Sequence, residues 1–227
     1  MTILCIETST SICSAAIYKD GMPAEQCICL EGSNHARLLP RYIEHLLQWA
    51  KEKVWTIDAV VVSEGPGSYT GLRIGVSTAK GICYGLNVPL IPLPTLQVLS
   101  AAAQAQIKES KALLCPMIDA RRMEVYTALY DASLQLQTEV KAVIVDEFFD
   151  TCSAQDVVYF GDGAEKCTKV ILSPNWHHIP DIYPQAQYMG KLAEQSTIRI
   201  QGADLAYFEP FYLKEFVAAQ SHVKGLK

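Results

Sequence analysis

The sequence predicts an α/β protein with mixed sheets flanked by helices, and three observations support this fold class. The chain begins with three short apolar runs in succession, which are typical of an antiparallel meander. Helical and strand-like patterns then alternate, as they do in right-handed parallel crossovers. A similar succession of strands begins the second half, so we expect a duplicated architecture, although no residue-level repeat is present. The length of 227 residues agrees with one large or two small domains.

The apolar pattern of the first half predicts five strands and three helices. The run at 59–62 is apolar without alternation, which is typical of a strand covered on both faces. Ser33 or Asn34 can cap the first helix, and Pro40 either kinks this helix or marks its start. In chain order, we expect strands at 3–7, 15–18 and 24–30, a helix with apolar positions from 38 to 50, a strand at 58–63, a helix from about 71 to 86, a strand at 90–93 and a helix from 95 to about 108.

The second half is expected to begin with strands at 112–118, 124–130 and 140–145, followed by one at 157–160. The apolar run at 210–213 is expected to pack back on the body of the protein. Residues 221–227 have the composition of a loose tail.

Composition and charge exclude several classes of protein. Half of the residues are hydrophobic and 19% are charged, which excludes a disordered chain. A net charge of -5 argues against binding nucleic acid alone, because phosphate contacts need concentrated Lys and Arg. No secretory signal is recognisable, and Pro89, Pro92 and Pro94 interrupt the uncharged stretch at 81–107. The sequence therefore indicates a soluble cytoplasmic protein without a membrane segment.

Eight cysteines lie mostly inside apolar runs, and no pair has C-x-x-C spacing. Zinc binding and thioredoxin-like chemistry therefore gain no support. Cys27 and Cys29 would share one face of a strand about 7 Å apart, within disulfide reach only through distortion. We expect free buried thiols in a reducing compartment.

The strongest local feature is the glycine-rich segment at 64–73, between a predicted buried strand and a helix. Backbone amides at the start of a helix can bind an anion, but this segment lacks the Lys-Ser/Thr pair of a Walker A loop. Thr70 stands where the dinucleotide fingerprint has its third glycine. A tight turn that only joins the strand to the helix is an equal alternative. The candidate nucleotide or anion ligands are Thr8, Ser9, Thr10, Gly65, Gly67 and Ser68.

Several long motifs follow one another along the chain. They are Glu7-Thr8-Ser9-Thr10, His35 followed by Leu38-Leu39-Pro40, the segment from Gly65 to Gly75, and Ile118-Asp119-Ala120-Arg121 with Glu124-Val125-Tyr126. Weaker matches follow at 161–164 and 210–213. In these motifs and their order the chain resembles the TsaB family, formerly YeaZ, from residue 1 to about residue 130.

This resemblance implies two ribonuclease-H-like domains around a cleft, as in the superfamily of actin, sugar kinases and Hsp70 ATPases. The expected division is a domain at 1–104 that carries the partner-binding helices and a smaller domain at 105–227. How far the last helix returns to the first domain is left open.

The resemblance also implies a role in forming N6-threonylcarbamoyladenosine beside the anticodon of tRNAs. In that system TsaD, a glycoprotease-like paralogue, is the catalytic subunit, TsaB supports it by association, and the ATPase TsaE joins through the complex of TsaB and TsaD. The implied partners are therefore TsaD, TsaE, a second copy of the chain when it is alone, and tRNA only through the complex. No cofactor of its own is implied, although ATP or ADP could bind at the junction with partner subunits.

The metal site of TsaD-like proteins has no counterpart here. Those proteins carry a His-His-Met-Glu-Gly-His run, and the corresponding positions are residues 94–99. Thr95 and Leu99 stand at the two ligand positions, where neither can replace an imidazole. Glu7 stands where ATPases of this superfamily have an aspartate that addresses magnesium through water. We therefore expect no catalytic residues, no metal site and no independent ATP hydrolysis.

A charged cluster lies between two predicted strands of the second half. Its members are Asp119, Arg121, Arg122 and Glu124. Carboxylate and guanidinium groups usually pair across such a turn, so we interpret the cluster as ion pairs. Contact with a partner or a ligand is the alternative.

The first helix carries more apolar residues than packing on a sheet requires, which indicates a second partner surface. In the next helix Gly71, Gly75, Gly81 and Gly85 form a stripe. Another backbone can approach such a stripe, or the glycines pack on the protein's own sheet. The predicted partner interface consists of Leu38, Leu39, Tyr42, Ile43, Leu46, Gly71, Gly75 and Ile82.

Three classes of function are consistent with these observations. The leading one is a non-catalytic subunit of a tRNA-modifying assembly. A small-molecule kinase or metallopeptidase-like enzyme of the same superfamily is the second, and it requires nucleotide or metal ligands that the sequence does not show. A homodimeric binding module unrelated to tRNA is the third.

Overall fold

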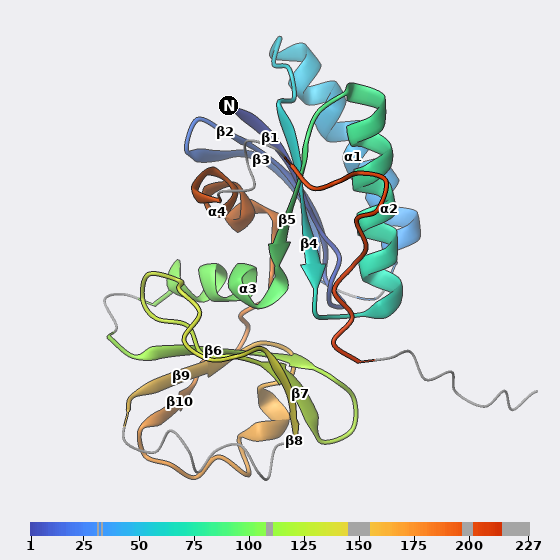
Figure 1. Ribbon diagram of the computed structural model, residues 1–227. Helices are drawn as coiled ribbons and strands as arrows, with labels where there is room; N and C mark the ends of the chain where they lie inside the picture. The colour runs from blue at the N-terminus through green and yellow to red at the C-terminus, as the bar shows by residue number, and fades with distance from the viewer. Residues whose placement is uncertain (31, 33, 108–110, 145–154, 197–201, 215–227) are drawn as a thin grey trace, which may run out of the picture.

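The computed structural model describes residues 1–30, 32, 34–107, 111–144, 155–196 and 202–214. These residues form two α/β units, each built on a five-stranded sheet (Figure 1). The strand order is β3-β2-β1-β4-β5 in the first sheet and β10-β9-β6-β7-β8 in the second. The predicted fold class, two α/β units with mixed sheets and flanking helices, is confirmed.

The first sheet contains an antiparallel meander and three parallel strands. β1, β2 and β3 pair antiparallel, and β1, β4 and β5 pair parallel. Every residue of β1 is buried, because helices cover both faces of the sheet, whereas β3 lies at its edge and is partly exposed. The strands are β1 (Thr2–Glu7), β2 (Cys13–Lys19), β3 (Met22–Cys29), β4 (Ala59–Gly65) and β5 (Leu90–Pro94).

Two helices cover each face of the first sheet. α1 (His35–Glu52) and α2 (Tyr69–Leu86) lie side by side on one face (Figure 1). α3 (Thr95–Gln104) and α4 (Met189–Gln195) lie on the other, and α3 also packs on β6, so that it stands between the two sheets. The end of α3 at residue 104 comes four residues before the expected end at about 108.

Local signals explain the bounds of α1 and α2. α1 begins at His35 and continues through Pro40, so Pro40 does not mark its start. Asn34 occupies the N-cap position of α1, but its side chain makes no capping hydrogen bond. The hydroxyl of Ser68 caps α2 by accepting from the backbone amide of Gly71, and Asn87 ends that helix in the left-handed conformation.

The second sheet repeats the mixture of parallel and antiparallel pairs. β6 pairs antiparallel with β7 and parallel with β9, β7 continues antiparallel to β8, and β9 pairs parallel with β10. Its strands are β6 (Leu113–Asp119), β7 (Glu124–Thr127), β8 (Lys141–Ile144), β9 (Val157–Phe160) and β10 (Trp176–His178). Two single 3-10 turns, η1 (Glu165–Cys167) and η2 (Ala186–Tyr188), follow β9 and β10.

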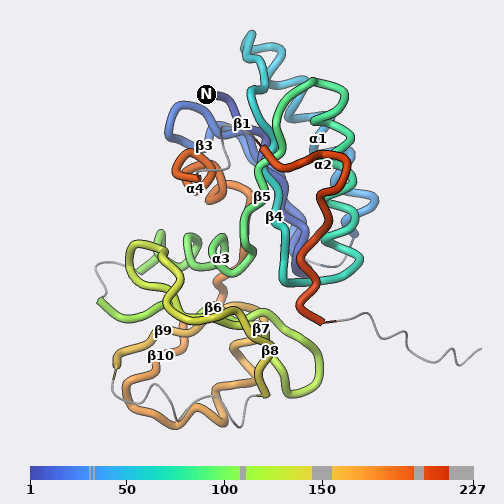
Figure 2. The backbone as a smooth tube through the Cα atoms, in the orientation of Figure 1, coloured from blue at the N-terminus to red at the C-terminus, as the bar shows by residue number. Residues whose placement is uncertain are grey.

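The last described elements return to the first sheet. Gly190 of α4 lies directly against the ring of Tyr18, and the Ala186 amide donates to the Ser14 hydroxyl at 3.0 Å. Residues 202–214, which we call the C-terminal strap, run along β5, β4 and α2 (Figure 2). The division of the chain at residue 104 stays a prediction.

Hydrogen bonds to β5, β4 and α2 help to hold the strap. The Ala203 amide donates to the Leu90 carbonyl at 2.8 Å, the Phe211 amide donates to the Glu64 carbonyl at 2.7 Å, and the Lys80 amine donates to the Phe208 carbonyl at 3.0 Å. The expected return of 210–213 to the body is confirmed, whereas the predicted loose tail at 221–227 lies outside the described residues. None of the seven described cysteines forms a disulfide, and Cys152 lies outside the described residues.

Candidate functional site

The turn after β1 and the loop before α2 pack directly on each other. Thr8, Ser9 and Thr10 are all buried. The Ser68 amide donates to the Ser9 carbonyl at 2.6 Å, and the Thr8 hydroxyl donates to the Gly71 carbonyl at 2.7 Å. Several donors that an anion would need therefore already bond within the protein. ATP, ADP or another anion at this loop stays a prediction.

Glycines allow the two loops to meet. A Cβ at Gly67 would overlap the Ser9 carbonyl oxygen, a Cβ at Gly71 that of Thr8, and a Cβ at Gly75 the Thr8 hydroxyl. Gly65 has a φ of +123°, and a Cβ there would overlap the Phe211 carbonyl of the strap. These glycines are needed for contacts within the chain itself.

Glu7 is fully buried beneath these loops. Its carboxylate accepts from the Ser9 amide at 2.6 Å and from the Ser63 hydroxyl. Burial raises the pKa of Glu7 above its ordinary value, although the hydrogen bonds from Ser63 and Ser9 lower it. Because both oxygens of this buried carboxyl accept hydrogen bonds, Glu7 helps to hold the turn after β1 in place.

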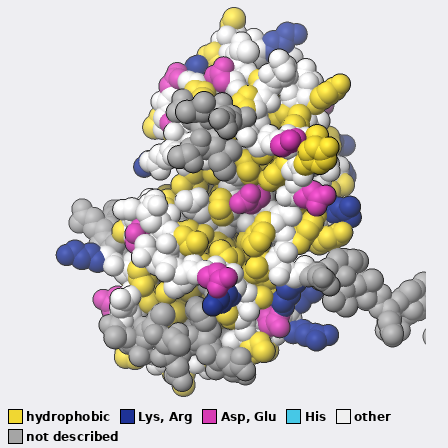
Figure 3. Space-filling model, viewed as in Figure 1, with side chains coloured by type: hydrophobic (Ala, Val, Ile, Leu, Met, Phe, Trp, Pro, Cys, Tyr) yellow, Lys and Arg dark blue, Asp and Glu magenta, His cyan; other side chains and the backbone are white. Residues whose placement is uncertain are grey.

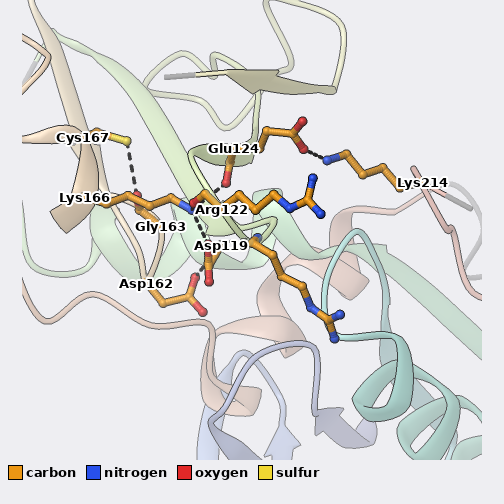
Figure 4. A network of polar contacts seen from close by, with 9 residues as sticks. Asp119, Arg122, Glu124, Asp162, Gly163, Lys166, Cys167 and Lys214 are labelled. Atoms are coloured by element: carbon orange, nitrogen blue, oxygen red, sulfur yellow. Dashed lines mark hydrogen bonds and ion pairs between the residues drawn. The ribbon is translucent and has the colours of Figure 1, made fainter. Parts of the chain in front are cut away.

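The charged cluster of the second unit is organised by lysines from elsewhere in the chain (Figure 4). Lys166 forms an ion pair with Asp119 and donates to the carbonyls of Arg122 at 2.9 Å and Glu124 at 2.7 Å. Lys214 of the strap forms an ion pair with the carboxylate of Glu124. Because Lys166 and Lys214 lie far from the cluster in sequence, the spacing of residues could not reveal them.

The sequence predicted ion pairs between the carboxylates and the arginines of this cluster. This prediction is wrong, because the carboxylates pair with lysines instead. Neither Arg121 nor Arg122 forms an ion pair with a described residue, and both are exposed. The Arg121 amide, rather than its guanidinium, donates to the Asp119 carboxylate at 3.1 Å. The acids of the hairpin bind lysines, which leaves the two guanidinium groups available at its tip.

The predicted partner interface divides into inward and outward residues. Leu39, Ile43 and Leu46 are buried against the sheet, and Gly71 and Gly75 pack on Thr8. These five positions are covered within the chain, which makes them less suited to contact a partner, and their place in the interface stays a prediction. Leu38, Tyr42 and Ile82 are only partly buried and remain candidates.

A smaller apolar surface is left on the outside of the two helices. Gly81 and Gly85 are exposed, and a Cβ at either position would meet no atom within 4 Å. Tyr42 reaches toward the edge strand, and burial and nearby cysteines raise its pKa. We call this the outer helical surface, and it consists of Leu38, Tyr42, Leu47, Ile74, Gly81, Ile82 and Gly85.

The positions that correspond to the metal ligands of TsaD-like proteins belong to the core. Thr95 and Leu99 lie in α3 and have no exposed surface. His35 is also buried, with its Nε2 3.1 Å from the Ile12 carbonyl oxygen. Within the described ranges, no group of three or more His, Cys, Asp or Glu side chains is arranged to hold a metal ion.

The described residues also line two cavities. One of about 640 Å³ is lined by Tyr18, Gln104, Tyr188, Lys191 and neighbouring residues of α3, α4 and the β2–β3 turn. The second, of about 300 Å³, lies between α2 and the strap and includes Arg73 and Lys80. Sequence reasoning identified neither, because the residues that line each one come from separate parts of the chain.

The two sheets, their helices and their topology define an α/β protein built of two units with mixed sheets. A solved structure of YeaZ from Pseudomonas aeruginosa is similar with a TM-score of 0.76, at 25% identity over 93% of this chain and 99% of that one. A second structure from that organism, of an uncharacterized protein similar to peptidase YEAZ, has a TM-score of 0.79 at 23% identity, over 94% of this chain and 99% of that one.

Comparison of sequences gives the family. The family model described as TsaD: tRNA N6-adenosine threonylcarbamoyltransferase matches residues 30–216. The tRNA threonylcarbamoyladenosine biosynthesis protein TsaB of Escherichia coli is 30% identical, over 96% of each chain. The TsaB of Bacillus subtilis is 36% identical over 131 residues, which are 57% of this chain and 55% of that relative, so this match spans about half of each. The chain belongs to the TsaB (YeaZ) family, as its motifs indicated. No helix among the described residues is both long and apolar enough to span a membrane.

Proposed function

We propose that this chain is a non-catalytic subunit that supports a TsaD protein in forming N6-threonylcarbamoyladenosine in tRNA. Membership of the TsaB family places its role in the biosynthesis of this modified nucleoside, the process for which its relatives are named. The particular task, assisting TsaD by direct association, is the part that we propose.

The outer helical surface is the observation that carries this proposal. Leu38 and Tyr42 on α1 and Ile74 and Ile82 on α2 are apolar or aromatic but only partly covered by the described chain. Between exposed Gly81 and Gly85 another backbone can approach α2 closely. A pair of helices from a partner would complete a bundle here, and a specific interface of this type buries at least about 1,000 Å².

Two further features favour the role of a non-catalytic subunit over that of a catalytic one. The positions of the TsaD metal ligands are occupied by Thr95 and Leu99, which are core residues of α3. The loops after β1 and β4 are tied together by their own hydrogen bonds. A nucleotide, where the assembly uses one, would bind at the junction with partner subunits. TsaE would join through the complex, and the same surface would form a homodimer when the chain is alone.

Association with TsaD from the same organism, measured by isothermal titration calorimetry, tests the proposal. Gly81→Leu should raise the thermal stability of the chain, because glycine weakens a helix, and should weaken association at least about tenfold by blocking close approach. Tyr42→Glu should also weaken association, because it would bury an unpaired carboxylate in the complex.

Leu172→Glu is the matched control, since Leu172 is 84% exposed in the second unit. It should leave the affinity unchanged. Wild-type affinity in both folded surface variants, or no association of the wild-type chain, would refute the proposal. Sedimentation of the chain alone tests the homodimer separately.

A further inference from the structure

The β6–β7 hairpin turns on two consecutive arginines in the left-handed backbone region. Arg121 has a φ of +67° and Arg122 one of +52°. Residues other than glycine rarely occupy this region, and two in succession carry a conformational cost. The turn is held by the Ala120 amide, which donates to the Glu124 carbonyl at 3.1 Å, and by the Arg121 amide on Asp119. The hairpin tip is therefore a hydrogen-bonded turn with two residues in the left-handed region.

The two acids of the hairpin, Asp119 and Glu124, are already paired. Lys166 neutralises Asp119, and Lys214 neutralises Glu124 (Figure 4). Lys166 also donates to the carbonyl of Arg122, which fixes the turn from beneath. Within the described ranges, no carboxylate forms an ion pair with either guanidinium. The two acids of the hairpin thus pair with lysines. Both arginine guanidinium groups stay exposed at the tip.

Lys214, which is paired with Glu124, lies beside this tip. Lys214 belongs to the end of the strap, and its amine lies 6.0 Å from the centre of the Tyr126 ring on β7. Figure 3 shows Lys and Arg side chains gathered at this edge of the molecule, where the described part of the strap ends. The tip is part of the second unit and is separate in the chain from the outer helical surface on α1 and α2.

We propose that Arg121 and Arg122 form a contact for the phosphate backbone of the tRNA when the chain is assembled with TsaD. This inference rests on the proposed function. A guanidinium is planar, always charged and able to donate two parallel hydrogen bonds to a phosphate. Phosphate contacts of this kind position an RNA without reading its sequence. With a net charge of -5, the chain by itself has little general attraction for RNA, so this contact adds to binding by the whole assembly.

RNA fits this site better than an acidic protein segment does. The two arginines are adjacent at one turn, so their guanidinium groups can reach neighbouring phosphates of an RNA backbone. The proposed protein partner already has an apolar surface on the other unit. An acidic patch on TsaD is the competing occupant, and the experiment separates the two.

The test measures binding of an unmodified tRNA transcript to the assembled complex at several salt concentrations. Arg121→Gln/Arg122→Gln should weaken tRNA binding by about tenfold near physiological salt and reduce the slope of log K against log salt by about 1 to 2. Arg121→Lys/Arg122→Lys should restore most of the slope. Thermal unfolding of each variant shows that the hairpin remains folded.

Lys169→Gln/Lys191→Gln is the matched control, because it removes two exposed cations located elsewhere. It should leave tRNA binding near the wild-type value. Unchanged tRNA affinity and salt slope in the arginine variant would overturn the RNA contact, and so would a loss confined to its affinity for TsaD. If the wild-type chain forms no complex with TsaD, the proposed function fails first, and this proposal fails with it.

Discussion

At Gly67 and Gly71 the absence of one atom, the Cβ, allows the loop before α2 to pack on the turn after β1. The sequence predicted a tight glycine turn or an anion loop, and it could not show that both glycines face the turn after β1. That contact joins residues about sixty positions apart, and a spacing motif contains only neighbours. The backbone overlap that a Cβ would cause explains why these positions hold glycine.

Gly67→Val should destabilise the chain by about 3 kcal/mol, because the new side chain would collide with the Ser9 carbonyl and separate the loops. Gly81→Ala should instead stabilise it by about 0.5 to 1 kcal/mol, because that glycine lies in an open helical position. Urea unfolding of both variants provides the measurement. Equal stability of Gly67→Val and the wild type would show that the loops are not packed as described.

Glu7 should make stability depend on pH. Its pKa is raised in the folded state, so folding favours the protonated form. The stabilisation is complete below the unfolded pKa of about 4.5 and is lost as the pH rises toward the folded pKa. Gln carries no charge, and it can still accept from the Ser9 amide through its oxygen while its amide nitrogen donates to the Ser63 hydroxyl.

We therefore expect the unfolding free energy of Glu7→Gln to exceed that of the wild type increasingly as the pH rises above about 4.5. Chemical denaturation of both proteins between about pH 4 and pH 8 tests this expectation. Parallel curves for the two proteins over the whole range would contradict the raised pKa.

At the scale of elements, α1 was predictable and the last elements were not. The apolar positions of α1 repeat over many turns, so its helical period is clear. β10 has three residues and α4 has seven, which is too short for a period to be recognised. Which apolar residues of α1 face the sheet was also not predictable, because both flanks of the buried stripe are apolar.

Ile43→Glu should therefore unfold the chain rather than act on association alone. Ile43 is 7% exposed and packs in the core beneath α1, where an unpaired carboxylate costs several kcal/mol. Circular dichroism during thermal unfolding measures the effect, and exposed Glu44→Gln is the control. A folded Ile43→Glu chain with wild-type stability would show that this face of α1 is not buried.

The β6–β7 hairpin depends on Lys166, which lies about forty residues later in the chain. Lys166→Met should lower the unfolding free energy by about 1 to 3 kcal/mol, because two carbonyls and the Asp119 carboxylate lose their donor. Exposed Lys169→Met should change it by less than about 0.5 kcal/mol. Similar losses in the two variants, measured by urea unfolding, would remove Lys166 from its supporting role.

At the scale of the whole molecule, the duplicated succession of strands correctly indicated two α/β units. The motif order correctly indicated the TsaB family. The return of α4 and the strap to the first sheet depends on contacts such as Gly190 on Tyr18, which no local pattern contains. The strap consequently brings Lys214 to the hairpin of the second unit, where it forms an ion pair with Glu124 of the charged cluster.

The central claim is that the chain acts as a supporting subunit through its outer helical surface. The most direct measurement is threonylcarbamoyladenosine formation on tRNA in a reconstituted reaction containing TsaD and the other required proteins from the same organism. The account predicts modification with the wild-type chain, none without it, and a loss of at least about tenfold with folded Gly81→Leu. Full modification without the chain, or with folded Gly81→Leu, would contradict the account.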